Sequence, residues 1–122
     1  MSKSKANYVD GFLIVVPKKN LAAYKRMATG GMKMWKKYGA LDYKECVGDD
    51  LKVAGVVATF PKVLKLKPSE TVIFSYITYK SKADRNRINA KVMNDPSMDP
   101  NMKMPFDMKR MSVGGFKILV DG

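Results

Sequence analysis

The order in which strand-like and helix-like segments follow one another constrains this chain most. Two long segments, NYVDGFLIVV at 7–16 and TVIFSYITY at 71–79, are rich in the β-branched and aromatic residues that are typical of strands. Both contain runs of consecutive apolar residues, so we expect both faces of each strand to be covered. Shorter strands are predicted at 41–47 and 111–120, and a less regular one at 53–60.

Two helices are predicted between these strands. The first covers 21–38, with Asn20 as its N-cap and Gly39 directly after its last turn. The second opens with Ser81 in a capping-box-like pattern and extends to about residue 94, where an Asp-Pro pair ends it. The order strand, helix, strand, strand, helix, strand predicts an α+β fold of the ferredoxin-like βαββαβ type with an antiparallel sheet.

The same arrangement predicts a partner for the sheet. In a ferredoxin-like fold both helices lie on one face of the sheet, and here the residues of the opposite face are also apolar. A second copy of the chain, packed face to face about a two-fold axis, is the simplest cover for that face. We therefore expect a homodimer through the sheet faces.

Length and composition limit the class of protein. The 122 residues and the 46% hydrophobic content fit a single domain over 1–122, with 1–6 as a flexible N-terminus. The longest apolar runs are too short to span a bilayer, and the first residues lack the apolar core of a signal peptide. The lone cysteine, Cys46, excludes an intrachain disulfide. We expect a cytoplasmic protein without a membrane partner.

The absence of histidine narrows the chemistry that this chain can perform. It excludes Ser-His-Asp and Cys-His catalysis, histidine-ligated haem, and most zinc and non-haem iron sites. Any acid–base catalysis must use Asp, Glu, Lys, Tyr or Cys. We expect neither a metal nor a cofactor.

The net charge of +12 raises the question of a nucleic-acid or other polyanion partner. Much of the excess falls within 18–37, which contains no acidic residue, and a second cluster falls within 62–67. The basic residues of the first cluster are Lys18, Lys19, Lys25, Arg26, Lys33, Lys36 and Lys37. Such a cluster is either a phosphate-binding surface or the solvated face of a helix, and the lack of a recognition motif favours the second interpretation.

Several motifs together resemble the YbaA-like family of uncharacterised bacterial proteins. They are YVDGF at 8–12, GALDYKECVGDD at 39–50, TVIFSYITYKS at 71–81, NAKVMNDPSM at 89–98 and MPFDMKRMSVGGF at 104–116. The resemblance implies membership of the dimeric α/β-barrel superfamily, in which ferredoxin-like protomers pair through their sheets. Members of that superfamily include cofactor-independent monooxygenases and isomerases, so the resemblance implies a fold rather than one activity.

The sequence departs from the pattern of this family at three positions. Asn86 stands where the family has an acidic residue, Ser97 where it has an arginine, and Met108 where it has a glycine. If the usual residues form a functional network, this protein lacks part of it.

Glu45 is the candidate catalytic residue. Alternation along its strand places it on the core-facing side together with Tyr43. In an enzyme, Glu45 would act as a base, and Trp35 and Tyr43 would form walls for an aromatic substrate. The alternative is that Glu45 lies at the rim of the sheet and pairs with a lysine, while Trp35 only packs.

Arg110 and Tyr76 complete the candidate ligand-binding residues. Arg110 is suited to bind a carboxylate. Alternatively, it pairs within the chain with a carboxylate such as Glu45, while Asp107 caps a turn, and we favour this structural role.

Methionine and glycine are concentrated near the end of the chain. Six methionines fall between 93 and 111, where they would line an adaptable pocket or fill the space over a helix end, and packing is the preferred interpretation. Gly114 and Gly115 predict a β-bulge or a close approach of the dimer partner.

These patterns lead to one main functional hypothesis and one alternative. The main hypothesis is a homodimer that binds a small molecule between sheet and helices, with a cofactor-independent monooxygenase or isomerase as its catalytic form. The alternative is a basic protein that binds nucleic acid or another polyanion. The sequence does not identify the ligand, and it leaves open whether the protein is an enzyme.

Overall fold

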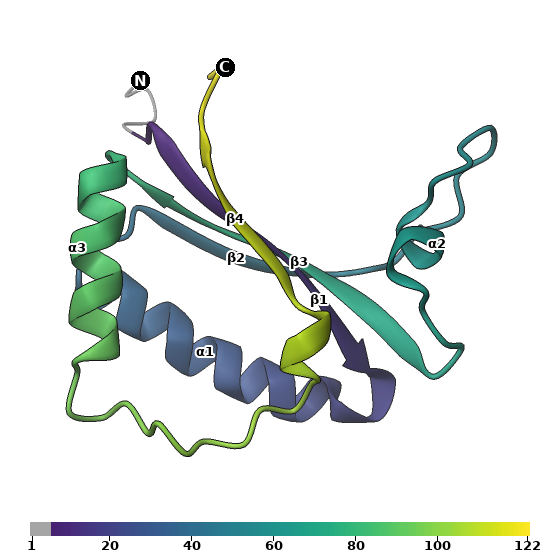
Figure 1. Cartoon of the computed structure of the whole chain (residues 1–122), viewed down its shortest axis with the longest axis horizontal. Coiled ribbons are helices and arrows are strands. Elements are labelled where there is room, and N and C mark those ends of the chain that lie inside the picture. The colour runs from purple at the N-terminus through teal and green to yellow at the C-terminus, as the bar shows by residue number, and fades with distance from the viewer. Residues whose placement is uncertain (1–5) are drawn as a thin grey trace.

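A computed structural model describes residues 6–122 and shows a ferredoxin-like α+β fold, as the sequence predicted (Figure 1). In chain order the elements are β1 (Tyr8–Pro17), η1 (Lys18–Asn20), α1 (Leu21–Lys37), β2 (Asp42–Val47), α2 (Phe60–Leu64), β3 (Glu70–Tyr79), α3 (Lys82–Met93), η2 (Met108–Arg110) and β4 (Ser112–Lys117). The four strands are all antiparallel in the order β2-β3-β1-β4, and α1 and α3 lie on the same side of the sheet. No helix in this part of the chain is long and apolar enough to cross a membrane.

The ends of the two long helices follow the predicted capping rules in most places. The Oγ of Ser81 accepts a hydrogen bond from the backbone N–H of Asp84 at 3.0 Å, which satisfies one of the free donors at the start of α3. Gly39 follows α1 with φ +115°, a conformation that favours glycine. Asn20 is the N-cap residue of α1, as predicted, but its side chain makes no capping hydrogen bond, and its amide instead donates to the carbonyl of Pro105 at 3.0 Å.

Strand register determines which side chains reach the helices. Alternate residues of β1, from Tyr8 to Val16, pack toward α1 and α3, and they form two buried clusters with residues of β3. One cluster includes Tyr79, Ile88 and Val92 beneath α3, and the other includes Val16 and residues of the first half of α1. Phe12 packs against both clusters, so the space above the middle of β1 connects them.

The prediction of a strand at 53–60 is wrong. Between β2 and β3 the chain forms an arm over residues 48–69 that projects beyond the end of the sheet and contains α2 (Figure 1). Gly55 turns the chain with φ +81°, and Pro61 lies in the first turn of α2, where its missing N–H costs no hydrogen bond. In the part of the chain that the structure describes, residues 53–60 have no neighbouring strand to which their backbone N–H and C=O groups could hydrogen-bond, and for this reason they do not form the predicted strand.

The last strand is shorter than predicted and contains no bulge. It pairs with β1 without interruption from Ser112 to Lys117, and Lys117 lies opposite Tyr8, the first residue of β1. Beyond that point the Ile118 N–H donates to the carbonyl of Asn7 at 3.1 Å, and residues 119 and 120 are exposed. The predicted flexible N-terminus, 1–6, falls mainly on residues 1–5, which lie outside the described residues, while Ala6 is buried.

The face of the sheet away from the helices carries exposed aromatic residues. Phe74 on β3 is 51% exposed and Phe116 on β4 is 60% exposed. The Phe116 ring lies over Gly11 and Gly114, whose missing side chains leave room for it. Tyr76 packs beside Phe74, with ring centroids 6.0 Å apart.

Candidate functional site

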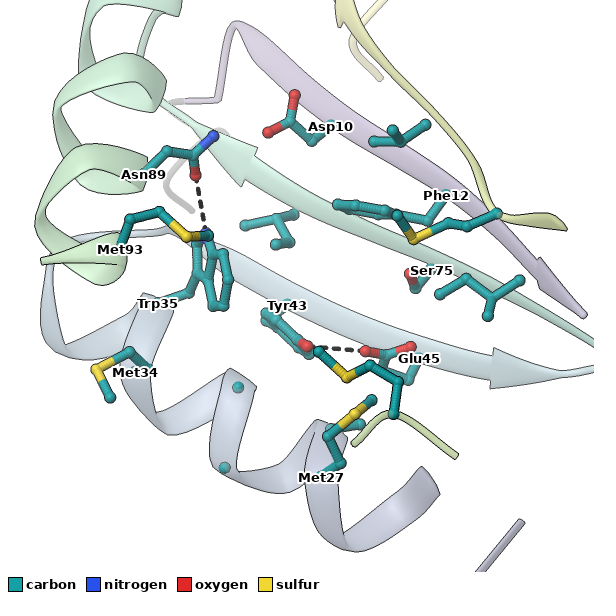
Figure 2. A pocket seen from close by; sticks show the side chains of 18 of the residues that line it. Asp10, Phe12, Met27, Met34, Trp35, Tyr43, Glu45, Ser75, Asn89 and Met93 are labelled. Atoms are coloured by element: carbon teal, nitrogen blue, oxygen red, sulfur yellow. Dashed lines mark hydrogen bonds between the residues drawn. The ribbon is translucent and has the colours of Figure 1, made fainter. Parts of the chain in front are cut away.

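A cavity of about 840 Å³ lies between the sheet, α1, α3 and the connector 94–107. Its volume falls within the range of pockets that enclose a small organic molecule. The connector runs from the end of α3 along the outside of α1 to η2 and β4, so it closes the side of the cavity that the two helices leave open (Figure 1). Figure 2 shows side chains of β1, β2, β3, α1 and α3 that point into this space.

Methionine forms much of the cavity wall. The six methionines that the sequence places between 93 and 111 all line the cavity, and two from α1 join them. The eight are Met27, Met34, Met93, Met98, Met102, Met104, Met108 and Met111. Because the methionine side chain is unbranched and polarizable, such a wall adapts to apolar surfaces of different shape.

Both ends of the connector are fastened to α1 or to the residues that flank it. At one end Asp95, which is buried, accepts hydrogen bonds from the Tyr38 hydroxyl, from Lys37 and from the backbone N–H and side chain of Ser97. Ser97, the tyrosine and the lysine hold the pKa of the Asp95 carboxyl well below its usual range. At the other end Pro105 accepts the hydrogen bond from Asn20.

Glu45 lies at the cavity with two tyrosine hydroxyls bound to it. Tyr24 of α1 donates to Oε1 at 2.7 Å, and Tyr43 of β2 donates to Oε2 at 2.8 Å. Burial, together with the hydrogen bond to Glu45 and its negative charge, raises the pKa of both tyrosines, so both remain donors at neutral pH. Gly31 makes room for this arrangement, since a Cβ at that position would lie 3.0 Å from the Tyr43 hydroxyl oxygen. The core-facing register predicted for Glu45 is therefore what the structure shows.

Trp35 stands beside this group on α1. Its indole N–H donates to Oδ1 of Asn89 on α3 at 3.0 Å, and its ring lies 6.3 Å from the Tyr43 ring (Figure 2). The same oxygen of Asn89 accepts a hydrogen bond from the Tyr79 hydroxyl at 3.4 Å. Trp35 therefore both packs between the helices and lines the cavity.

A charged pair forms the opposite end of the cavity. Nε of Arg85 lies 3.7 Å from Oδ1 of Asp10, and Nη2 of Arg85 donates to the Tyr8 hydroxyl at 3.0 Å. Asp10 also accepts a hydrogen bond from Tyr79 at 3.2 Å, and burial together with Asp10 raises the pKa of that tyrosine. The Nε of Arg85 is buried without a hydrogen bond. Gly115 permits the approach, because a Cβ there would lie 2.9 Å from Nη2 of Arg85.

Several polar residues of the cavity, among them Asp10, Asn89 and Arg85, were not predicted from the sequence. The strand alternation could have predicted Asp10. It lies two residues before Phe12 on the core-facing side of β1, just as Glu45 lies two residues after Tyr43 on the core-facing side of β2. Nothing in the sequence shows that α3 places Arg85 beside it.

Two of the predicted ligand-binding residues lie elsewhere. Tyr76 is on the opposite face of the sheet, next to Phe74. Arg110 binds Glu70 at 2.6 Å and the carbonyls of Leu64 and Lys65 at 3.1 and 3.2 Å, so it fastens the arm to the start of β4. The structural role favoured for Arg110 is confirmed, but its carboxylate partner is Glu70 rather than the suggested Glu45.

The cavity side chains can bind an apolar body and a few polar groups. Within residues 6–122 no cluster of three or more cysteine, aspartate and glutamate side chains could hold a metal ion. The methionine and aromatic walls would contact the body of a ligand, while Glu45 at one end and the Arg85–Asp10 pair at the other would contact its polar groups.

Comparison with known proteins places the chain among relatives of its own length. A family model described as "Protein of unknown function (DUF1428)" matches residues 7–108. The chain is 42% identical over 115 residues to "Uncharacterized protein YbaA" of Escherichia coli (strain K12), covering 93% of this chain and 97% of that protein. The YbaA of Shigella flexneri matches to the same extent. Among solved structures, the de novo designed protein Foldit4 covers 92% of this chain and 98% of its own at 10% identity and a TM-score of 0.46.

Proposed function

The chain belongs to the DUF1428 family, a family of unknown function, and from its geometry we propose that it binds a small molecule in the cavity between the sheet and the helices. The observation that carries this proposal is the cavity itself, with a volume of about 840 Å³ and walls of methionine and aromatic side chains. Side chains normally fill the space between a sheet and its helices, because protein interiors are packed as densely as organic crystals, whereas here a partly open space remains. The space that remains fits an organic molecule.

A catalytic form of this function would use Glu45 as a base. A cofactor-independent isomerase or monooxygenase begins by removing a proton from its substrate, and Glu45 is the carboxylate held between the tyrosines of α1 and β2. However, the Tyr24 and Tyr43 hydroxyls each already donate to one oxygen of this carboxylate, so a substrate proton would have to share or displace one of these hydrogen bonds. The geometry therefore supports binding more strongly than proton abstraction.

The proposal is tested by native mass spectrometry of freshly purified protein, followed by unfolding to release any bound molecule. We expect an additional mass of a few hundred daltons, which is lost on unfolding. In a second preparation, Ala28→Leu adds a side chain at a buried position of the cavity wall and should lower the bound fraction. Ala22→Leu, at an exposed position of the same helix, is the matched control.

Two results would contradict binding in the cavity. One is equal occupancy of Ala28→Leu and Ala22→Leu when both variants show the same cooperative thermal transition as the natural chain. The other is the absence of any additional mass together with unchanged Trp35 fluorescence in the presence of apolar probes. Trp35 lines the cavity and is the sole tryptophan of the chain, so a change in this space alters the emission without a contribution from another tryptophan.

The proposed function includes a homodimer that pairs through the sheet faces. Phe74 and Phe116 support it, since both rings lie half-exposed on the face away from the helices. A second copy would bury them without closing the cavity, which opens on the other side of the sheet.

Polyanion binding is the second candidate, and the charge of α1 favours it. The seven basic residues of 18–37 are all exposed, and no acidic residue lies among them. Binding to single- or double-stranded nucleic acid that falls steeply between 50 and 200 mM salt would support this function. Weak binding that does not respond to salt would exclude it.

A further inference from the structure

The charge of the cavity is opposite to that of the chain. The chain carries a net charge of +12, from 23 basic and 11 acidic residues. The ionised side chains that line the cavity are the carboxylates of Asp10, Glu45 and Asp99 and the single guanidinium of Arg85. The cavity wall is therefore negative, although the net charge of the chain is positive.

Glu45 is the carboxylate in this wall that lacks a counter-charge. Asp10 has Arg85 at 3.7 Å, and Asp99 is exposed to solvent at the rim. Four ion pairs join side chains within residues 6–122, and none of them includes Glu45. A half-buried anion without a cation is unfavourable in a protein that has so many lysines available to pair with it.

The hydrogen bonds to Glu45 do not replace that cation. Both come from tyrosine hydroxyls, and both tyrosines stay neutral because burial and the nearby carboxylate raise their pKa. The two bonds fix the position and orientation of the carboxylate. An ionised carboxylate accepts about four hydrogen bonds, so further lone pairs can face the cavity.

The walls beside Glu45 also favour a positive charge. The ring centroids of Trp35 and Tyr43 lie 6.3 Å apart. The faces of both rings are electron-rich and attract cations. The Phe106 ring, which lies 5.8 Å from the Tyr24 ring, adds a third aromatic surface to the same wall. The methionine sulfurs around them are polarizable and carry no positive charge that would repel a cation.

We propose that the cavity binds an organic cation, namely a protonated amine on an apolar or aromatic body, whose ammonium group donates to the carboxylate of Glu45. This inference rests on the proposed function and adds the chemical class of its ligand. The ligand supplies the positive charge that Glu45 lacks within the chain. The apolar body lies against the methionines of the connector and the ring of Trp35.

The test compares three probes that share one body and differ in charge: 4-phenylbutylamine, 4-phenylbutan-1-ol and 4-phenylbutyrate. Binding to the whole chain is measured at pH 7 and 150 mM salt by calorimetry and by Trp35 fluorescence. We expect the amine to bind about tenfold or more tightly than the alcohol, because its hydrogen bond to Glu45 is charge-assisted. The carboxylate should bind most weakly, although non-specific attraction to a chain of charge +12 would favour it.

Matched variants assign the preference to one carboxylate. Glu45→Gln keeps the shape of the side chain and should reduce the preference for the amine to about twofold or less. Asp42→Asn makes the same charge change on the opposite face of β2, where Asp42 accepts a hydrogen bond from Thr78, and should leave the preference unchanged. Tyr43→Phe, which removes one of the two hydrogen bonds, should weaken binding of the amine.

The outcomes separate this inference from the function on which it rests. Equal or tighter binding of the alcohol or the carboxylate by the natural chain overturns the inference and leaves small-molecule binding in place, whether or not the variants fold. Retention of the preference in folded Glu45→Gln also overturns it. If none of the three probes binds and no mass accompanies the purified protein, both proposals fail.

Discussion

At the scale of single residues, missing side chains decide where the polar groups of the cavity lie. Gly31 leaves space for the Tyr43 hydroxyl, and Gly115 leaves space for Arg85 beside Tyr8. Each glycine has a neighbour, Gly30 or Gly114, where a Cβ would meet nothing closer than 3.7 Å. In each pair, one glycine is required by the packing around it and the adjacent glycine is not, so the two positions can be compared by the same substitution.

The first prediction compares alanine at the two glycines of α1. Gly30→Ala should stabilise the protein by about 1 kcal/mol, because alanine favours a helix and the new Cβ has no neighbour within 4 Å. Gly31→Ala should gain much less, since its Cβ would lie 3.0 Å from the Tyr43 hydroxyl oxygen, which must then shift by a few tenths of an ångström from its position at Glu45. Urea unfolding gives both free energies, and Trp35 fluorescence should change only in Gly31→Ala. Equal stabilisation would show that Tyr43 moves freely.

The second prediction concerns Asp95, which fastens the connector to α1. The pKa of the Asp95 carboxyl is lower in the folded state than in the unfolded state, so ionised Asp95 stabilises the fold. This stabilisation is fully present above the ordinary carboxyl pKa of about 3.9, and it is lost as the pH falls through the lower folded value. Asp95→Asn should lower Tm at pH 7, and the difference from the natural chain should shrink toward pH 2. Parallel Tm curves over pH 2–7 would show that the charge of Asp95 has no role.

At the scale of secondary structure, the long strands and both long helices could be predicted and the arm could not. The segments of β1 and β3 are both long and apolar, and each has a clear end: β1 ends at Pro17, and β3 is followed by the helix cap Ser81. The strands that this local pattern predicts are the same strands that pair with each other in the sheet. The stretch 53–60 has β-branched residues as well, yet Gly55 and Pro61 turn it into a loop and a short helix. The end of the arm is held by Arg110, which donates to the carbonyl of Leu64 and to Glu70 from far along the chain, and no local pattern reveals these contacts.

The third prediction tests how the arm is held. Arg110→Met removes the bonds to Glu70 and to two carbonyls of the arm, so the arm should open more often. Trypsin cleavage after Lys62 and Lys65 should then become roughly tenfold faster, because hydrogen bonds to a charged group are involved. Lys109→Met removes the neighbouring charge and should leave the rate unchanged. If both variants are cleaved alike, other contacts hold the arm.

At the scale of the whole molecule, the sheet has a closed face and an open face. The closed face carries the cavity, and sequence periodicity was sufficient to place Trp35, Tyr43 and Glu45 there. It was insufficient for Asp10 and Arg85, because their pairing depends on how α3 lies across the sheet. The open face was predicted to be apolar, and the exposed rings of Phe74 and Phe116 confirm that property.

The last prediction concerns the partner of the open face. If two copies pair through their sheets, the natural chain should sediment at twice its 13.7 kDa, and Phe74→Lys should sediment as a monomer at micromolar concentration. The reason is that lysine would place a charge of the same sign from each copy in a desolvated interface, which costs several kcal/mol. Val57→Lys, at a 79% exposed position of the arm, adds the same charge outside the sheet face and should remain dimeric. A dimer that survives Phe74→Lys but dissociates with Val57→Lys would place the interface on the arm instead of the sheet. A natural chain that sediments as a monomer would show that the two exposed rings have no role in self-association.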